Sequence, residues 1–213
     1  MARKPDIARR RDIARQAFAV IRSRGVHRTS MSDLAVALDM KRPTLYWYFK
    51  DLGEIFDSVA NETDAQWGAF VAARLAGVDH PIDYLETLLA ASVDFYEARR
   101  DDIITLFQLW AVGAHASARI LARGREYLVP MRAGLIDRLR AGIAAGRVAA
   151  CDPAKIVDIV LAVADGVQVQ RVTRDADLAP IVAAVSEYVL APLRIPAARS
   201  SRPPSGRSGR RQT

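Results

Sequence analysis

Cysteine is almost absent from this 213-residue chain, in which Cys151 is the single example. One thiol excludes an internal disulfide and a thiolate metal cluster, and it suits a reducing compartment. Long apolar runs are also missing: the longest stretch free of Asp, Glu, Lys and Arg is residues 103–118, or 16 residues, whereas a membrane-spanning helix needs about 20. No apolar run follows the basic start of the chain, as a signal peptide requires. We therefore expect a cytoplasmic protein without a membrane partner.

Signatures of catalysis are scarce as well. The three histidines, His27, His80 and His115, lie on separate predicted elements and lack the spacing of metal ligands. Cys151 has no histidine nearby in sequence, and neither a glycine-rich phosphate loop nor a nucleophile elbow is present. We expect no metal, no cofactor and no enzymatic activity, although a catalytic triad can assemble from distant positions.

The chain does contain apolar residues at helical spacing, and its charge is concentrated at the two ends. Apolar residues make up 51% of the chain, and strand-like alternation is scarce, which predicts an all-α fold. The net charge of +7 is uneven, because residues 1–28 carry +7, residues 194–213 carry +6, and the remainder carries −6. An acidic body with basic ends is typical of a nucleic-acid-binding protein, and solubilising tails are the alternative.

Helical periodicity and stop signals divide the chain into about nine helices. Their approximate bounds are 8–24, 30–38, 42–49, 51–71, 81–99, 101–111, 117–145, 152–174 and 177–192. Pro130 predicts a bend in the seventh helix, and Gly146 predicts its end. Asp101 or Asp102 is the predicted cap of the sixth helix.

The first three predicted helices, within residues 8–50, have the outline of a helix-turn-helix. Ser30, with Asp33 three residues later, predicts a capping box at the start of the second helix. Pro43 suits the first turn of the third, where a missing N–H costs nothing. Helix pairs with short connectors also occur in plain bundles, so the outline alone does not assign a function.

The segment TSMSDLAVALDMKRPTLYWYFKD, residues 29–51, resembles the DNA-binding segment of the TetR family of bacterial transcriptional regulators. The family pattern is roughly T-x-x-x-I-A-x-x-A-G-V-S-x-G-T-L-Y-x-Y-F. The matching positions are Thr29, Leu34, Ala35, Thr44, Leu45, Tyr46, Tyr48 and Phe49. We expect a DNA-binding domain in residues 1–54, a helical regulatory and dimerisation domain in residues 55–194, and a disordered basic tail in residues 195–213.

Three positions depart from the family pattern. Asp39 replaces the turn glycine, and Asp tolerates the left-handed conformation better than most residues. Lys41 replaces the capping serine. This substitution removes a helix cap worth about 1 kcal/mol and adds a positive charge that attracts phosphate. Leu52 stands where the family often has lysine. These departures affect the contacts with DNA and not the fold.

The third helix is the predicted recognition helix, which enters the major groove with its N-terminal end near the bases. Leu45 and Phe49 share one face on a 3.6-residue period and should pack inward, so other rings turn outward. The predicted DNA-binding residues are Thr29, Lys41, Arg42, Pro43, Thr44, Tyr46, Trp47, Tyr48 and Lys50. Their partner is double-stranded DNA with a palindromic operator sequence. Basic residues of the N-terminal arm, among them Arg3, Lys4 and Arg9 to Arg11, are further candidates.

The segment DPAKIVDIVLAVADGVQVQRV, residues 152–172, is apolar on more than one face, so more than one face must be buried. Contact with the core on one side and with a second subunit on the other satisfies this, and a fully buried core helix is the alternative. The family resemblance implies a homodimer held by a four-helix bundle. The predicted interface residues are Ile156, Ile159, Val160, Val163, Val167, Val182, Val185 and Val189.

The middle helices surround a ligand pocket in the family that the chain resembles. Aromatic residues with a few polar groups suit a largely apolar small molecule, although an aromatic stripe is more often core. The predicted effector-binding residues are Tyr96, Phe107, Gln108, Trp110, His115 and Tyr127. The function that follows is a dimeric repressor released from DNA by its ligand. A regulator without a ligand, and an activator, are the alternatives.

Overall fold

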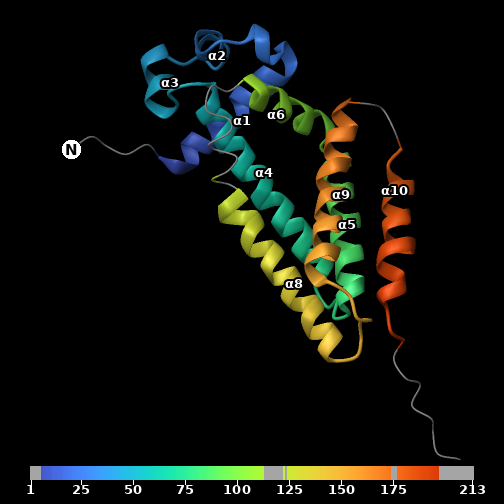
Figure 1. The fold of residues 1–213 in the computed structure, drawn as a ribbon. Helices are drawn as coiled ribbons and strands as arrows, with labels where there is room; N and C mark the ends of the chain where they lie inside the picture. Colours follow the sequence, from blue (N-terminus) through green and yellow to red (C-terminus); the bar gives the residue numbers. More distant parts are fainter. Residues whose placement is uncertain (1–5, 113–121, 123, 174–176, 197–213) are drawn as a thin grey trace, which may run out of the picture.

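The computed structural model describes residues 6–112, 122, 124–173 and 177–196. Its elements are α1 (Ile7–Arg24), η1 (Val26–Arg28), α2 (Met31–Ala37), α3 (Arg42–Tyr48), α4 (Leu52–Leu75), α5 (Pro81–Glu97), α6 (Arg100–Val112), η2 (Gly124–Leu128), α8 (Val129–Ala144), α9 (Pro153–Thr173), α10 (Ala179–Ala184), η3 (Val185–Leu190) and η4 (Ala191–Leu193). The predicted all-α fold is confirmed. Figure 1 shows α2 and α3 at one end of an elongated body in which α4, α5, α8 and α9 run side by side, with α10 on its flank.

Local sequence signals determine several helix ends. The predicted capping box is confirmed: the Asp33 amide donates to Ser30 Oγ at 3.2 Å, and the Ser30 amide donates to Asp33 Oδ2 at 2.8 Å. Gly25 ends α1 with φ +89°, and Gly146 follows α8 with φ +66°. Asp39 adopts the expected left-handed conformation, with φ +49°, in the turn between α2 and α3. These backbone conformations favour glycine, so Asp39 retains some strain.

The first of two apolar cores joins α1–α4 to α6. Leu45 and Phe49 lie in it at or just after α3, and α6 contributes Ile103, Leu106 and Leu109. Because α6 follows α5 in the chain yet packs beside α1 and α4, the core beneath the predicted DNA-binding helices includes residues far beyond position 54. A movement of α6 would therefore disturb the support of α3.

The second core lies between α4, α5, α8, α9 and η3. Leu85 and Leu89 of α5 are buried against Leu139 of α8 and Val157 of α9. The helix α4 extends through both cores, since its first half contributes Ile55 and Val59 to the first core and its second half contributes Val71 to the second. The two ends of the molecule are thus connected by one continuous 24-residue helix.

Three predicted helices differ from the structure. The sixth begins at Arg100, so neither Asp101 nor Asp102 is its cap; both lie in its first turn, where negative charge suits the helix dipole. The described part of the seventh is a π-helical turn followed by α8, in which Pro130 occupies the first turn and lacks the N–H that an uninterrupted helix needs. The last helix is likewise divided into α10, η3 and η4.

The start of α5 uses a cap that the sequence analysis did not predict. His80 accepts a hydrogen bond from the Ile82 amide at Nδ1, 3.2 Å away, while its Nε2 lies 3.2 Å from the Arg147 carbonyl oxygen. The neutral tautomer with the proton on Nε2 satisfies both contacts. In the described part of the chain, no helix is sufficiently long and apolar to cross a membrane.

Gly142 and Gly134 of α8 provide a matched test of the second core. A Cβ at Gly142 would lie 2.6 Å from Pro81 Cγ and 2.8 Å from Val148 Cγ2, whereas a Cβ at Gly134 would meet open space. Gly142→Ala should lower stability by about 1–2 kcal/mol through overpacking, and Gly134→Ala should raise it by about 0.5–1 kcal/mol through helix propensity. Chemical denaturation measures both, and equal shifts in the same direction would refute the packing described for Gly142.

Candidate DNA-binding surface and effector cavity

The predicted recognition helix, α3, separates its residues onto two faces. Leu45 and Phe49 are fully buried, while Tyr46 and Trp47 are 40% and 47% exposed. Tyr48 is half-buried and packs against the first core, and its ring lies 4.7 Å from that of Trp47. The inward packing predicted for Leu45 and Phe49 is confirmed. The outer face therefore presents aromatic side chains that rest on an apolar anchor.

Positive charge surrounds these rings. Lys41, Arg42, Pro43 and Thr44 are exposed at the start of α3, and the Arg42 guanidinium lies 5.7 Å from the Tyr46 ring centroid. Lys50 is 86% exposed and lies 3.8 Å from Glu54, its i+4 neighbour. An ion pair this exposed is weak, so Lys50 can turn to a phosphate. Side chains of these types can contact both the phosphates and the base edges of DNA.

Arg10 holds the C-terminal end of α3 in place. Its Nε donates to the Tyr48 carbonyl at 3.1 Å, its guanidinium lies 4.4 Å from the Phe49 ring centroid, and its terminal nitrogen lies 3.5 Å from Glu54. Arg10 therefore fixes the position of the C-terminal end of α3. Arg9 forms an exposed pair with Asp12 at 3.2 Å, and Arg3 and Lys4 lie outside the described residues.

Thr29 differs from the other predicted DNA-binding residues. It is 5% exposed, and its hydroxyl donates to the Gly25 carbonyl at 2.9 Å, so it braces the turn before α2 instead of belonging to the exposed surface. Val36 of α2, in contrast, is 82% exposed and was not singled out from the sequence. Its exposure could have been predicted from helical periodicity, because Val36 does not lie on the buried face formed by Met31, Leu34 and Ala35.

The larger domain contains a cavity of about 330 Å³ between α4, α5, η2, α8 and α9. Of the predicted effector-binding residues, Tyr96 and Tyr127 line it. Phe107 instead packs against the first core, and Gln108 is exposed and lines none of the described cavities. The Trp110 side chain and His115 lie outside the described residues.

Most of the lining residues were not predicted, because four helices that are distant in sequence supply them. They include Asp64, Trp67, Leu88, Ser92, Arg132, Ala164, Asp165 and Gln168. Trp67 donates from Nε1 to Ser92 Oγ at 3.2 Å, and its ring lies 6.2 Å from that of Tyr127. The absence of a side chain at Gly68 lets the Tyr127 hydroxyl approach α4.

Charged and hydroxyl groups also line this cavity. Burial, and after it the carboxylates of Asp64 and Asp165, raise the pKa of the Tyr96 hydroxyl, which stays protonated. Desolvation also raises the pKa of the Asp165 carboxyl. Arg132 is engaged by Asp158 through two hydrogen bonds of 2.6 and 2.8 Å. The described part of the cavity wall thus combines aromatic rings with the guanidinium of Arg132 and the carboxylates of Asp64 and Asp165.

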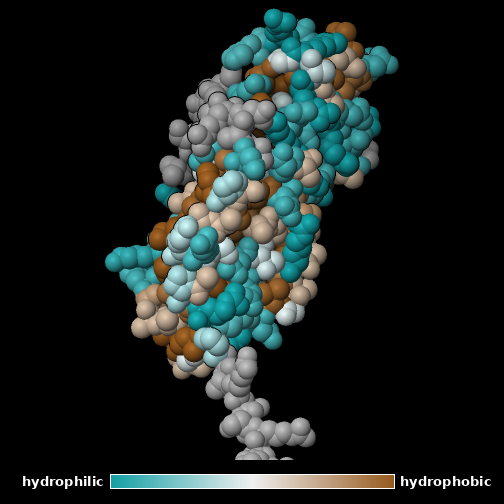
Figure 2. Space-filling model, turned by 90° about the vertical axis from the view of Figure 1, so that its right-hand side faces the viewer, coloured by the Kyte–Doolittle hydropathy of each residue, from teal (hydrophilic) through white to brown (hydrophobic). Residues whose placement is uncertain are grey.

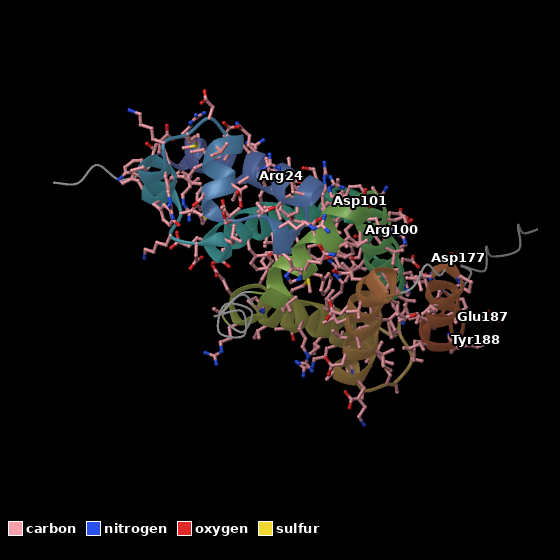
Figure 3. All side chains as sticks on the ribbon, turned by 90° about the horizontal axis from the view of Figure 1, so that it is seen from above. Arg24, Arg100, Asp101, Asp177, Glu187 and Tyr188 are labelled. Atoms are coloured by element: carbon pink, nitrogen blue, oxygen red, sulfur yellow. The ribbon has the colours of Figure 1, made fainter. Side chains whose placement is uncertain are left out.

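The C-terminal helices expose apolar residues on the side of the molecule seen in Figure 2. Among the predicted interface residues, Ile159 is 41% exposed, and Ile156, Val163, Val182 and Val189 are half-buried. Val160, Val167 and Val185 are buried within the chain, so they are core residues and not available to a partner. Val169 and Tyr188, 47% and 71% exposed, were not predicted; Figure 3 shows Tyr188 on the outer side of the last helix.

Comparison with known proteins agrees with this geometry. Residues 6–59 match the family model for bacterial regulatory proteins of the tetR family. Among curated proteins, no sequence matches the chain significantly. The regulator PfmR from Thermus thermophilus is similar over 84% of this chain and 97% of its own, with 21% identity and a TM-score of 0.60.

Two further solved structures share the fold. A TetR/AcrR-family regulator from Thermobifida fusca has 24% identity and a TM-score of 0.60, over 86% of this chain and 97% of its own. AibR, in complex with isovaleryl coenzyme A and operator DNA, has 18% identity and a TM-score of 0.57, over 87% and 98%. Residues 6–59 thus form a domain of the tetR family of bacterial regulatory proteins, and the described chain shares the fold of these solved regulators.

The contacts of Arg10 predict that its replacement lowers the stability of the fold, whereas replacement of the neighbouring Arg9 does not. Arg10→Ala removes a hydrogen bond, a ring contact and an ion pair, so it should destabilise the fold by about 1–2 kcal/mol. Arg9→Ala removes an exposed pair and should change stability by less than about 0.5 kcal/mol. Chemical denaturation measures the unfolding free energy of both variants. Equal values for the two would contradict the role given to Arg10 in holding the end of α3.

Proposed function

We propose that this protein is a homodimeric, sequence-specific transcriptional repressor that a small, largely apolar ligand releases from its operator. The observation that carries DNA binding is the face of α3, where Tyr46, Trp47 and Arg42 project from a helix whose Leu45 and Phe49 are buried. A short helix held so firmly can place the same side chains against base edges in each encounter with DNA. We retain residues 1–54, 55–194 and 195–213 as its three parts.

Dimerisation is supported by the apolar surface of α9 and the last helix. Ile159, Ala162 and Val169 are exposed at helical spacing, and together with Tyr188 they leave an apolar face that water would otherwise cover. A two-fold axis through this face brings α9, α10 and their partner copies into a four-helix bundle. Such a dimer presents two α3 helices to half-sites about 34–36 Å apart.

Ligand control is supported by the position of Tyr96. Its side chain lines the cavity, and it also borders a narrow groove with Ile103 and Ile104 of α6. Because α6 contributes to the core that holds α3, a ligand that displaces Tyr96 changes the surroundings of the DNA-binding end. The ligand releases DNA only to the extent that it prefers the displaced arrangement.

A regulator without an effector, and an activator, remain the alternatives. In the first, the cavity has no occupant and DNA affinity does not respond to small molecules. In the second, ligand binding increases the affinity for the operator. The structure of AibR contains both isovaleryl coenzyme A and operator DNA. It supports the proposal that a protein with this fold can bind a small molecule as well as DNA.

Substitutions on α3 should separate general from base-specific contacts. Lys50→Ala should weaken binding to all sequences and reduce the slope of log K against log salt by roughly 2 for a dimer, about 1 per lysine. Trp47→Ala and Arg42→Ala should instead change base preference by about 1–3 kcal/mol at one position. Equilibrium binding in a salt series measures both effects.

Lys155→Ala serves as the matched control for Lys50. Lys155 is 81% exposed at the start of α9, on an element with no role in the proposed DNA contact, so its loss should leave affinity and salt dependence unchanged. If Lys50→Ala also left the salt slope unchanged, the phosphate contact would be wrong.

The dimer surface is tested by one introduced charge. Ile159→Asp places a carboxylate in the proposed interface, which should raise the dimer dissociation constant at least about 100-fold. Ala73→Asp adds the same charge at an exposed position of α4 and should have no effect. Sedimentation equilibrium measures both variants, and an Ile159→Asp protein as dimeric as the control would place the interface elsewhere.

A further inference from the structure

A second hollow lies between the proposed DNA-binding domain and the larger domain, apart from the proposed effector cavity. It is a groove of about 240 Å³ between α1, α4 and the residues that join α5 to α6. Three of its lining residues are arginines: Arg15, Arg22 and Arg99. We infer that this groove binds a small phosphate-bearing anion, which the three guanidinium groups hold together. The site goes beyond the proposed function and does not depend on it.

Arg99 provides the first support. It is half-buried at the last position before α6, and its guanidinium carbon lies 4.0 Å from the centroid of the Phe95 ring. Within the described part of the chain, no carboxylate pairs with it. Stacking on a ring uses the flat face of a guanidinium and leaves the N–H donors at its edge. Arg99 therefore retains donors for an oxyanion that enters the groove.

The other two arginines are each paired with one carboxylate. Arg15 Nε lies 3.5 Å from Glu62 Oε2, and Arg22 pairs with Asp102. Both arginines are exposed, and ion pairs at the surface contribute little to stability, so either guanidinium can turn to an anion at small cost. With three arginines and two carboxylates, the described lining carries one more positive charge than negative.

The arrangement of the donors favours phosphate over a single carboxylate. The helix α1 supplies two of the arginines, α4 supplies Gln66, and the junction of α5 and α6 supplies Arg99. Gln66 donates one long hydrogen bond, 3.4 Å, to Glu62, so its amide can also turn to an anion. Donors that come from three sides require a ligand with several acceptor oxygens, and guanidinium groups bind phosphate through paired, charge-assisted hydrogen bonds.

The groove lies away from the face that is proposed to bind DNA. Figure 1 shows α4 running from the end that carries α3 into the body of the molecule. Glu62 follows Leu52, the first residue of α4, by ten residues, which is about 15 Å along a helix. The ligand that fits this position is a free small anion and not the DNA backbone.

An anion in the groove would connect α1 with α6. Phe18 of α1 lines the groove and also belongs to the first core, to which α6 contributes Ile103 and Leu106. The same core holds α3 through Leu45. An occupied groove would therefore strengthen the attachment of the proposed DNA-binding domain to the larger domain.

Inorganic pyrophosphate is the probe for this site. Isothermal titration into the full-length protein, in about 0.15 M chloride to screen the exposed basic ends, should give a dissociation constant of roughly 0.1–1 mM. Arg99→Gln should weaken binding about tenfold, because it removes hydrogen bonds between two charged groups. Thermal unfolding of each variant checks that the fold is intact.

Arg74→Gln is the matched control. The Arg74 guanidinium also stacks on a ring, 4.0 Å from the centroid of Phe70, but it pairs with Asp94 at 3.3 Å and lies outside the groove. Its replacement removes the same charge and the same kind of ring contact. Affinity for pyrophosphate should stay within about twofold of the unmodified protein.

Glu62→Gln should act in the opposite direction. It removes a carboxylate that lines the groove and leaves Arg15 without its ion-pair partner, so pyrophosphate should bind about threefold more tightly or better. A variant that merely disturbed the fold would not gain affinity. This variant also tests the site on its own if Arg99→Gln proves unstable.

Three results would overturn the inference and leave the proposed effector cavity and the role of α3 untouched. They are no binding of pyrophosphate at millimolar concentration, equal affinity in Arg99→Gln and the unmodified protein, and no gain in Glu62→Gln. The phosphate of DNA is the competing source. If Arg99→Gln lowered the affinity for nonspecific duplex DNA as much as Lys50→Ala does, the groove would contact DNA, and the small-anion site would be wrong.

Discussion

The burial of Leu45 and Phe49 beneath α3 is the interaction on which the rest of the structure depends. A helix of seven residues is too short to be stable alone in water, so tertiary contacts must hold it. The first core covers one face, and Arg10 closes the C-terminal end through Phe49 and the Tyr48 carbonyl. Because these contacts hold the helix rigidly, its other face can be given wholly to exposed rings and cations.

The same core connects α3, the proposed DNA-binding helix, to the region of the proposed effector cavity. Its boundary does not follow the chain, since Ile103, Leu106 and Leu109 of α6 complete it from far along the sequence. Beside α6 stands Tyr96, which also borders the cavity of the larger domain. The helix α3, the first core, α6 and the cavity therefore form one series of packed contacts, and close packing transmits small displacements.

Local features of the structure were the most predictable from sequence. The Ser30–Asp33 capping box, the left-handed Asp39 and the glycines after α1 and α8 each follow from two or three neighbouring residues, whose conformational preferences act at short range. The faces of α3 followed from periodicity. Periodicity indicates that a face is apolar but not which part of the protein covers it. The predicted interface on α9 therefore included core residues such as Val160 together with exposed residues such as Ile159. The cavity was the least predictable, since Asp64, Tyr127 and Asp165 meet only through tertiary packing.

The central claim is that two copies of α3 read duplex DNA from a paired body. Selection of bound sequences from a random pool of duplexes, performed with the full-length protein, tests it most directly. We predict enrichment of a palindrome whose two arms are centred about 10–10.5 base pairs apart, or a multiple of that spacing. Recovery of unenriched sequences, or of a single arm bound by a monomer, would contradict the claim.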